Sequence, residues 1–182
     1  MNLAKFLRNL SACMLLSVLF GCSSQLPTSQ TTFNRSEAVK ARINLALAYL
    51  DQHDLPKAKE NIDKALSHDQ NDYLPHSVLA YYYQQIGDQV HAEQAYQQAL
   101  KLSNNRPDVL NNYGTFLCKQ AKFDQAYQQF EQAVQSEQPY YHQADSLENI
   151  VLCAKQEPNL AKVNEALSQL EKLDKARAAA LR

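Results

Sequence analysis

The sequence predicts an all-α fold, a solenoid of about four helix-turn-helix repeats with a C-terminal capping helix. Two observations carry this prediction. The 182 residues include only three glycines and no tryptophan, whereas alanine and glutamine are abundant, and this composition favours helices over sheets. In addition, small and apolar residues recur every 34 residues over most of the chain, which indicates a repeat architecture.

The charge and the length exclude some classes of protein. Lysine and arginine total 18 and aspartate and glutamate total 19, so the net charge is -1. A chain with this balance lacks the basic surface with which proteins bind nucleic acid. The length fits one domain with a processed or flexible end. We therefore expect neither a nucleic-acid partner nor a second large domain.

Residues 1–21 have the pattern of a bacterial lipoprotein signal peptide. A basic start is followed by an apolar run from Leu10 to Phe20, which is too short to remain as a membrane-spanning helix. The run leads into a Leu-Phe-Gly-Cys sequence that ends at Cys22 and resembles the lipobox, where a peptidase cleaves before a cysteine that becomes acylated. The alternative is a general secretory signal in which Cys22 has no such role.

The residues after this box predict how the protein is anchored. Several acyl chains on Cys22 would hold the protein durably on a membrane, because one chain binds only marginally. Ser23 follows, and by resemblance to the sorting rule of such lipoproteins this favours the outer membrane. Residues 22–35 are polar and predict a flexible tether to a folded domain at 36–182. We expect a lipid-anchored protein on the periplasmic face of the outer membrane.

The repeat is carried by positions that agree across three units. Each unit has a small residue in its first helix and, in its second helix, two alanines that flank a large apolar residue. These positions hold Ala46, Ala80 and Gly114, then Ala58, Ile62 and Ala65, Ala92, Tyr96 and Ala99, and Ala126, Phe130 and Ala133. Small residues let two helices approach closely, and the large ones fill the space between units. The pattern resembles the tetratricopeptide repeat (TPR), with units at about 39–72, 73–106 and 107–140.

Helix start and stop signals agree with these units. Gly87 and the aspartate after it predict a helix end and an N-cap, and Pro107 suits the first turn of a helix. A fourth unit at about 141–174 is looser, with Ala161 near the expected small position, one residue late. The tail at 172–182 is a strong helix former that we expect to cover the last repeat.

Two cysteines remain in the predicted domain. Cys118 and Cys153 fall late in successive first helices, and because the periplasm is oxidising they are candidates for a disulfide. Two buried free thiols are the alternative.

No residue pattern indicates catalysis, a metal site or a cofactor. The histidines are dispersed and form no HExxH motif: they are His53, His68, His76, His91 and His142. Carboxylates such as Glu60 and Asp63, or Glu165 and Glu171, fall on outer faces of second helices, where solvent-exposed charge is ordinary. We expect a protein that is not an enzyme and that acts through a binding surface.

In TPR stacks, one side of each first helix lines a concave groove. Mapping that side onto this sequence gives an apolar N-terminal end and a polar continuation. The candidate partner-binding residues are Ile43, Leu47, Leu50, Leu74, Tyr81, Gln84 and Asn111. A contiguous apolar strip commonly marks a partner site, which an extended peptide or strand could occupy. The alternative is that the tether or the start of the first helix folds back over Ile43 and Leu47.

The last two repeats carry a more specific resemblance. Residues 111–118 read NNYGTFLC, residues 123–126 read FDQA and residues 148–153 read ENIVLC. Together with the lipobox, these segments resemble the PilF/PilW family of type IV pilus biogenesis lipoproteins. The resemblance implies a disulfide between the third and fourth repeats. It also implies a pilotin, an outer-membrane lipoprotein that helps a secretin subunit reach that membrane and assemble into a ring.

The expected partner is thus a secretin subunit or another pilus assembly protein, bound through the TPR groove, with membrane contact through the lipid anchor. The competing function is a structural scaffold in another envelope complex, one that stabilises the pilus fibre or assembles outer-membrane proteins.

Overall fold

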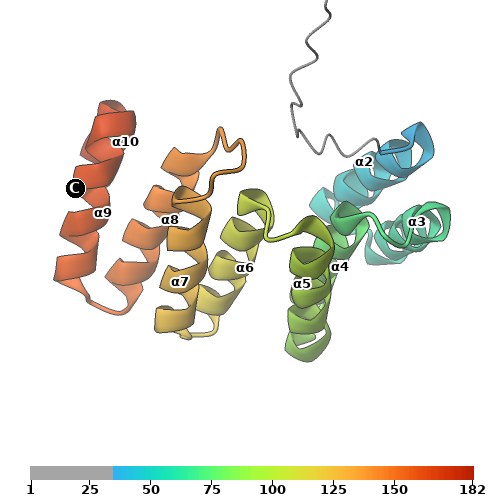
Figure 1. The fold of residues 1–182 in the computed structure, drawn as a ribbon. Helices are drawn as coiled ribbons and strands as arrows, with labels where there is room; N and C mark the ends of the chain where they lie inside the picture. Colours follow the sequence, from blue (N-terminus) through green and yellow to red (C-terminus); the bar gives the residue numbers. More distant parts are fainter. Residues whose placement is uncertain (1–34) are drawn as a thin grey trace, which may run out of the picture. The chain divides into compact units, whose positions relative to one another are not determined.

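The computed structural model describes residues 35–182, where the secondary structure consists of helices without strands. The predicted signal peptide, Cys22 and nearly all of the predicted tether lie outside the described residues. Within the described range the helices form hairpins that follow one another side by side (Figure 1). The all-α solenoid of helix-turn-helix repeats is confirmed. None of the described helices is long and apolar enough to cross a membrane.

The helices pair in chain order, and each pair is one repeat. The pairs are α2 (Glu37–Asp51) with α3 (Leu55–His68), α4 (Tyr73–Gln85) with α5 (Gln89–Ser103), α6 (Pro107–Lys119) with α7 (Phe123–Val134), and α8 (Gln143–Gln156) with α9 (Leu160–Leu173). The short helix α10 (Lys175–Ala180) packs against α9. In addition, α2 packs against α4 and α6 against α8, so first helices contact first helices.

Short polar side chains begin most of the second helices. The Asp88 carboxylate accepts a hydrogen bond from the backbone N–H of His91 at 3.1 Å, and Asp54 and Asn159 begin α3 and α9 in the same way. Each cap satisfies an N–H group that has no partner inside its helix. Before Asp88, Gly87 has a φ of 78°, a left-handed conformation that glycine adopts without strain. The sequence signal at this turn therefore marks the boundary between the two helices of the second repeat.

The two helices of the third repeat cross at a glycine. A Cβ atom at Gly114 would lie 2.7 Å from a ring carbon of Phe130, which is 1% exposed and fills the space beside α6. Ala46 and Ala80, at the matching positions of the first two repeats, are fully buried. The predicted small residue is thus required by close packing between paired helices.

The fourth repeat has a longer spacing than the other three. Val163 and Leu167 take the buried positions that Ala126 and Phe130 hold in the third repeat. Each lies 37 residues after its counterpart, in place of the 34 residues that separate the earlier repeats. Ala161, which the sequence placed near the small position of this repeat, is exposed, so that assignment is wrong. The reason is the loop at 135–142 between α7 and α8, which is longer than the other loops between repeats and delays the helices that follow.

A disulfide links the first helices of the third and fourth repeats. The Sγ atoms of Cys118 and Cys153 are bonded at 2.05 Å, and their Cα atoms are 5.9 Å apart. Both side chains are buried. Of the two alternatives left open by the sequence, the structure contains the bridge, which joins the C-terminal ends of α6 and α8.

Candidate protein-binding groove

A groove follows the first helices of the repeats. It encloses about 480 Å³ and is lined by side chains of α2, α4, α6 and α8. Tyr96 of α5 also contributes to its lining. Five of the residues predicted to contact a partner line it, and these are Leu47, Leu74, Tyr81, Gln84 and Asn111. Residues far apart in the sequence thus form one surface because successive first helices lie next to each other.

Two predicted residues do not line this groove. Ile43 is 2% exposed and Leu50 is fully buried, and both belong to a core cluster that joins α2 to Ile62 of α3 and Val78 of α4. Because α2 packs against both α3 and α4, apolar side chains on that flank of α2 are buried in the core between the three helices. Their assignment to the groove is therefore wrong. Ile43 also needs no cover from the tether, since the core already buries it.

The first half of the groove is apolar. Leu47 and Tyr81 are each 37% exposed. Leu74 also lines this half of the groove and is partly buried. Val78 lies deeper and is 5% exposed. Large apolar side chains held at a concave surface are the usual anchoring points for a bound peptide.

A buried tyrosine supports the middle of the groove. Gln84 donates a hydrogen bond from its Nε2 to the hydroxyl oxygen of Tyr96, which is 2% exposed. Burial raises the pKa of the Tyr96 hydroxyl well above its usual range, because the charged phenolate would lose its hydration. Tyr96 is therefore neutral at all physiological pH values, and it fixes the orientation of the Gln84 amide.

The far half of the groove is polar and tied to the fourth repeat. The Oδ1 atom of Asn111 accepts hydrogen bonds from Ser146 Oγ at 2.9 Å and from Asn149 Nδ2 at 3.0 Å. Ser146 is fully buried, and the Tyr140 hydroxyl lies 2.7 Å from its Oγ. This network joins α6 to α8 beside the disulfide. Asn111 is therefore both a lining residue and a structural link.

Sequence reasoning did not identify the partners of Asn111. Asn149 lies in the ENIVLC segment that was noted for its family resemblance, yet no spacing rule connects it with Asn111. Ser146 offered a weak signal, since it is a polar residue on the otherwise apolar buried face of α8. A polar group at such a position needs a hydrogen-bond partner, and Asn111 supplies it.

The only charged side chain among the residues that line the groove is Lys119, which is exposed. Lys119 also lines a neighbouring cavity of about 180 Å³ beside the disulfide, together with Leu152 and Thr115. The lining consists otherwise of apolar, amide and hydroxyl side chains. This chemistry suits noncovalent binding of an extended segment, and it includes no carboxylate that could act as an acid or base.

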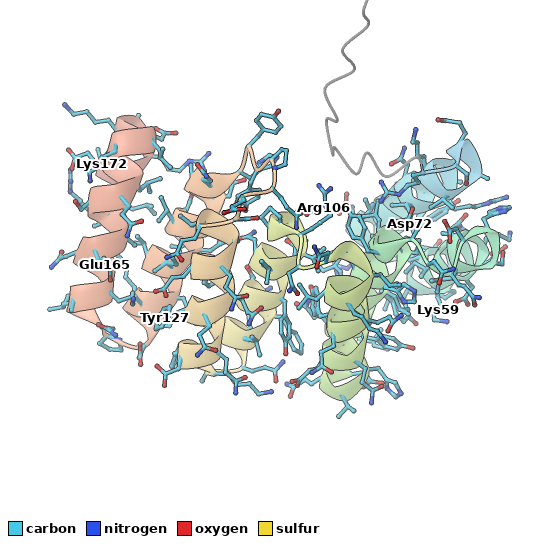
Figure 2. The ribbon with its side chains drawn as sticks, viewed as in Figure 1. Lys59, Asp72, Arg106, Tyr127, Glu165 and Lys172 are labelled. Atoms are coloured by element: carbon cyan, nitrogen blue, oxygen red, sulfur yellow. A yellow bond between two sulfur atoms is a disulfide. The ribbon has the colours of Figure 1, made fainter. Side chains whose placement is uncertain are left out.

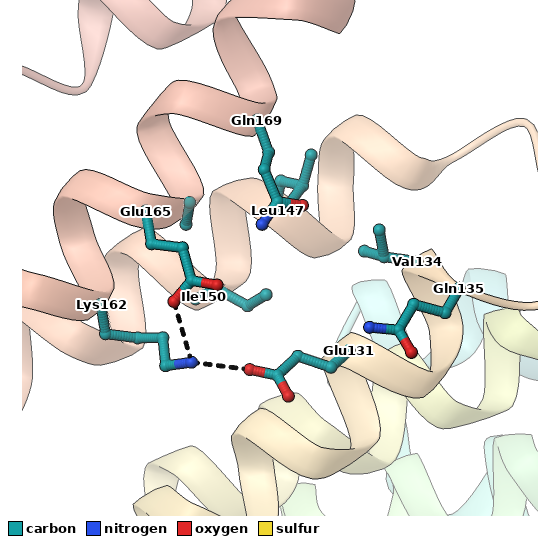
Figure 3. Close-up of a pocket in the computed structure, with 9 residues that line it drawn as sticks. Glu131, Val134, Gln135, Leu147, Ile150, Lys162, Glu165 and Gln169 are labelled. Carbon is teal, nitrogen blue, oxygen red and sulfur yellow. Dashed lines mark hydrogen bonds and ion pairs between the residues drawn. The ribbon is translucent and has the colours of Figure 1, made fainter.

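A separate cavity, also of about 180 Å³, lies between α7, α8 and α9 (Figure 3). Lys162 crosses its mouth, with Nζ 2.7 Å from Glu131 Oε1 and 3.2 Å from Glu165 Oε2. The hydrogen bond to Glu131 raises the pKa of Lys162, so this ammonium group stays charged. The ion pairs are satisfied within the protein and connect the third repeat to the fourth. We assign this cavity a structural role.

In the part of the chain that the structure describes, no group of three or more histidine, cysteine, aspartate or glutamate side chains is arranged to hold a metal ion.

Comparisons with known proteins agree with this architecture. A family model described as tetratricopeptide repeat matches residues 76–106. An uncharacterised protein of Haemophilus influenzae is 47% identical over 171 residues, which cover 94% of this chain and 93% of that protein. The type IV pilus assembly protein PilF of Pseudomonas aeruginosa is 32% identical over 159 residues, which cover 86% of this chain and 63% of that protein.

Solved structures give the same picture. The structure of P. aeruginosa PilF matches with a TM-score of 0.71 and 31% identity, covering 81% of this chain and 68% of that one. PilW, described as a widely conserved type IV pilus biogenesis factor, matches with a TM-score of 0.68 and 22% identity, covering 76% and 63%. YrrB, a TPR protein with an unusual peptide-binding site, matches at 0.61 and 19% identity, covering 79% and 73%. The matches to PilW and YrrB show the fold alone.

Proposed function

We propose that the chain, a tetratricopeptide repeat protein that belongs to the same family as the uncharacterised Haemophilus influenzae protein, is an assembly factor of the type IV pilus. In this proposal it acts by binding and not as an enzyme. The similarity to PilF in sequence and structure supports a role in pilus assembly. Because the chain spans 63% of the length of that PilF, the activity and partners of the whole relative come to this chain as a proposal.

The client we propose is a secretin subunit, which the protein would accompany to the outer membrane as a pilotin. The groove along α2, α4, α6 and α8 is the observation that carries this proposal. Its apolar half offers Leu47, Leu74 and Tyr81 as anchors, and its polar half offers amide groups and Lys119. An extended segment of the client can place apolar side chains in the first half and satisfy its backbone polar groups in the second.

The proposed lipid anchor at Cys22 explains how binding becomes delivery. Acyl chains would commit the protein to the outer membrane, and a client in the groove would travel with it. Localisation on the periplasmic face of the outer membrane is part of the same proposal. Retention of the client would depend on the groove, and its destination would depend on Cys22.

The first test compares secretin assembly in cells that lack the protein with cells that carry a Cys22→Ala form. We expect heat-resistant secretin multimers to disappear from the outer membrane in the deletion strain. We expect multimers in the wrong membrane when Cys22 is replaced. Intact multimers together with unstable pili would replace the pilotin proposal by a structural scaffold.

The groove is tested by Leu47→Asp and Tyr81→Asp, with Val90→Asp as the matched control. Val90 is 66% exposed and lies on α5 outside the groove lining, so its replacement adds the same charge to another surface. Loss of an apolar anchor at an interface typically costs about 2 kcal/mol, or roughly thirtyfold in affinity. We expect that loss for the two groove variants with unchanged helix content. Wild-type affinity in both would overturn the assignment of the groove.

A further inference from the structure

The loops that connect successive repeats form one continuous edge of the described domain, which also contains Arg35. Arg35 Nη2 donates to Asp72 Oδ1 at 2.8 Å, and Asp72 is 1% exposed. The guanidinium groups of Arg35 and Arg106 each lie 5.2 Å from the ring centroid of Tyr73 (Asp72 and Arg106 are labelled in Figure 2). These contacts fix the position at which the chain enters the folded domain.

The same edge continues through the next repeats. Gln138 belongs to the long loop between α7 and α8, and Asn104 belongs to the loop between α5 and α6. Gln138 Nε2 donates a hydrogen bond to the carbonyl oxygen of Asn104 at 2.9 Å. His142 Nδ1 is 3.0 Å from Asp145, and Asp145 accepts a hydrogen bond from Arg177 of α10. We call this surface the loop edge and define it by Arg35 and the loops at 69–72, 104–106 and 135–142.

The loop edge presents an exposed aromatic ring. Tyr141 lies at the C-terminal end of the 135–142 loop, two residues before α8, and is 93% exposed. Its neighbour Tyr140 is held by the hydrogen bond between its hydroxyl and Ser146, so the backbone next to Tyr141 is anchored while the Tyr141 ring is exposed. The residues that lengthen this repeat thus place a large amphipathic side chain in solvent. Tyrosine rings at such positions favour the headgroup region of a membrane.

We propose that the loop edge faces the lipid surface and that the ring of Tyr141 lies at the level of the headgroups. The inference rests on the proposed acylation of Cys22. Twelve residues, 23–34, lie between Cys22 and Arg35 in the sequence. A chain of that length spans about 20 Å on average when it is unstructured, and at most about 45 Å when it is fully extended.

That reach favours the loop edge over the opposite edge, where the two helices of each repeat turn. A helix of 14 residues is about 21 Å long, so the turns lie about that much farther from the point where the chain enters the domain. One tyrosine binds a membrane weakly by itself. A short tether, however, raises its effective concentration at the surface to about the millimolar range, where a weak contact is sufficient to orient the domain.

The absence of tryptophan from the sequence gives a direct test. Tyr141→Trp and Val90→Trp each introduce a single tryptophan, the second of them in the first turn of α5 on the opposite edge. Each full-length protein is produced with its signal sequence and reconstituted into vesicles of phosphatidylethanolamine and phosphatidylglycerol, with or without brominated phosphatidylcholine. Mass spectrometry first measures acylation of Cys22, and a protein without acyl chains would refute the proposed anchor itself.

With acylation established, quenching of fluorescence by the brominated lipid decides the orientation. We expect roughly twofold quenching and a blue shift for Tyr141→Trp, and neither change for Val90→Trp. Equal quenching of the two tryptophans, or none at position 141, would overturn the inference. If Tyr141→Trp is not quenched and Tyr141→Ser weakens binding of the secretin, the loop is a protein-docking surface and the lipid assignment is wrong.

Discussion

Removing the disulfide tests how the fourth repeat is held in place. The change is Cys118→Ala together with Cys153→Ala. The bridge closes a loop of 35 residues between α6 and α8, and in the chain-entropy model such a loop contributes about 4 kcal/mol by restricting the unfolded chain. Alanine is chosen because both side chains are buried, where a serine hydroxyl would need a hydrogen-bond partner. We therefore expect a loss of about 4 kcal/mol in the free energy of unfolding.

Urea unfolding followed by circular dichroism measures this loss. Hydrogen exchange then assigns it, because repeat proteins lose their weakest unit first and we expect amides of α8 to α10 to exchange fastest in the variant. The single variants are the internal control. Each one breaks the bridge, so each should cost nearly as much as the double variant. Small and additive single effects would show that side-chain packing, and not the bridge, accounts for the stability.

Three further predictions concern helix crossing and charge. Gly114→Val would force a branched side chain against Phe130, and we expect a loss of about 2 kcal/mol in chemical denaturation, with partial recovery in a Phe130→Leu background. Asp72→Ala removes the α4 N-cap and the Arg35 ion pair together, and we expect a loss of about 3 kcal/mol in thermal unfolding. The hydrogen bond from Arg177 lowers the pKa of Asp145, so its stabilising contribution is present above the unfolded pKa and is lost as pH falls through the lower folded pKa. The stability difference between wild type and Asp145→Asn should therefore shrink below about pH 4 in acid titrations of unfolding.

The regular part of the fold could be predicted because the information is local. Residues such as Ala58 and Ala92 recur at an interval of 34 residues, and each pair of helices packs through residues that are near in sequence. The groove assignment of Leu47 and Tyr81 also followed from that spacing. Ile43 could not be separated from Leu47 by periodicity, since both are apolar and lie one helical turn apart. Only the packing of α2 against α3 and α4 decides that Ile43 is buried and Leu47 is exposed.

The fourth repeat was harder to predict for a different reason. A repeat spacing indicates where helices should recur, but a longer loop shifts the register without any signal in the helices themselves. Ala161 looked suitable because it is small, whereas Val163 takes the buried position. The link from Asn111 to Ser146 depends on the same tertiary arrangement, so no property of either residue alone predicts it.

The two halves of the groove differ in what supports them, and this leads to a last prediction. The apolar half lies on α2 and α4, whereas the polar half combines Asn111 and Lys119 of α6 with Asn149 of α8. Client binding should therefore depend on whether α8 stays docked. In the variant that lacks both cysteines, α8 should undock at a lower urea concentration, and from that point the apparent affinity falls in proportion to the population that retains the complete groove. We expect binding of the purified secretin periplasmic region to be lost at a lower urea concentration in this variant than in wild type, with equal affinity in the absence of urea. Loss at the same urea concentration in both proteins would show that the client needs only the apolar half, and Asn149→Ala should then leave binding unchanged.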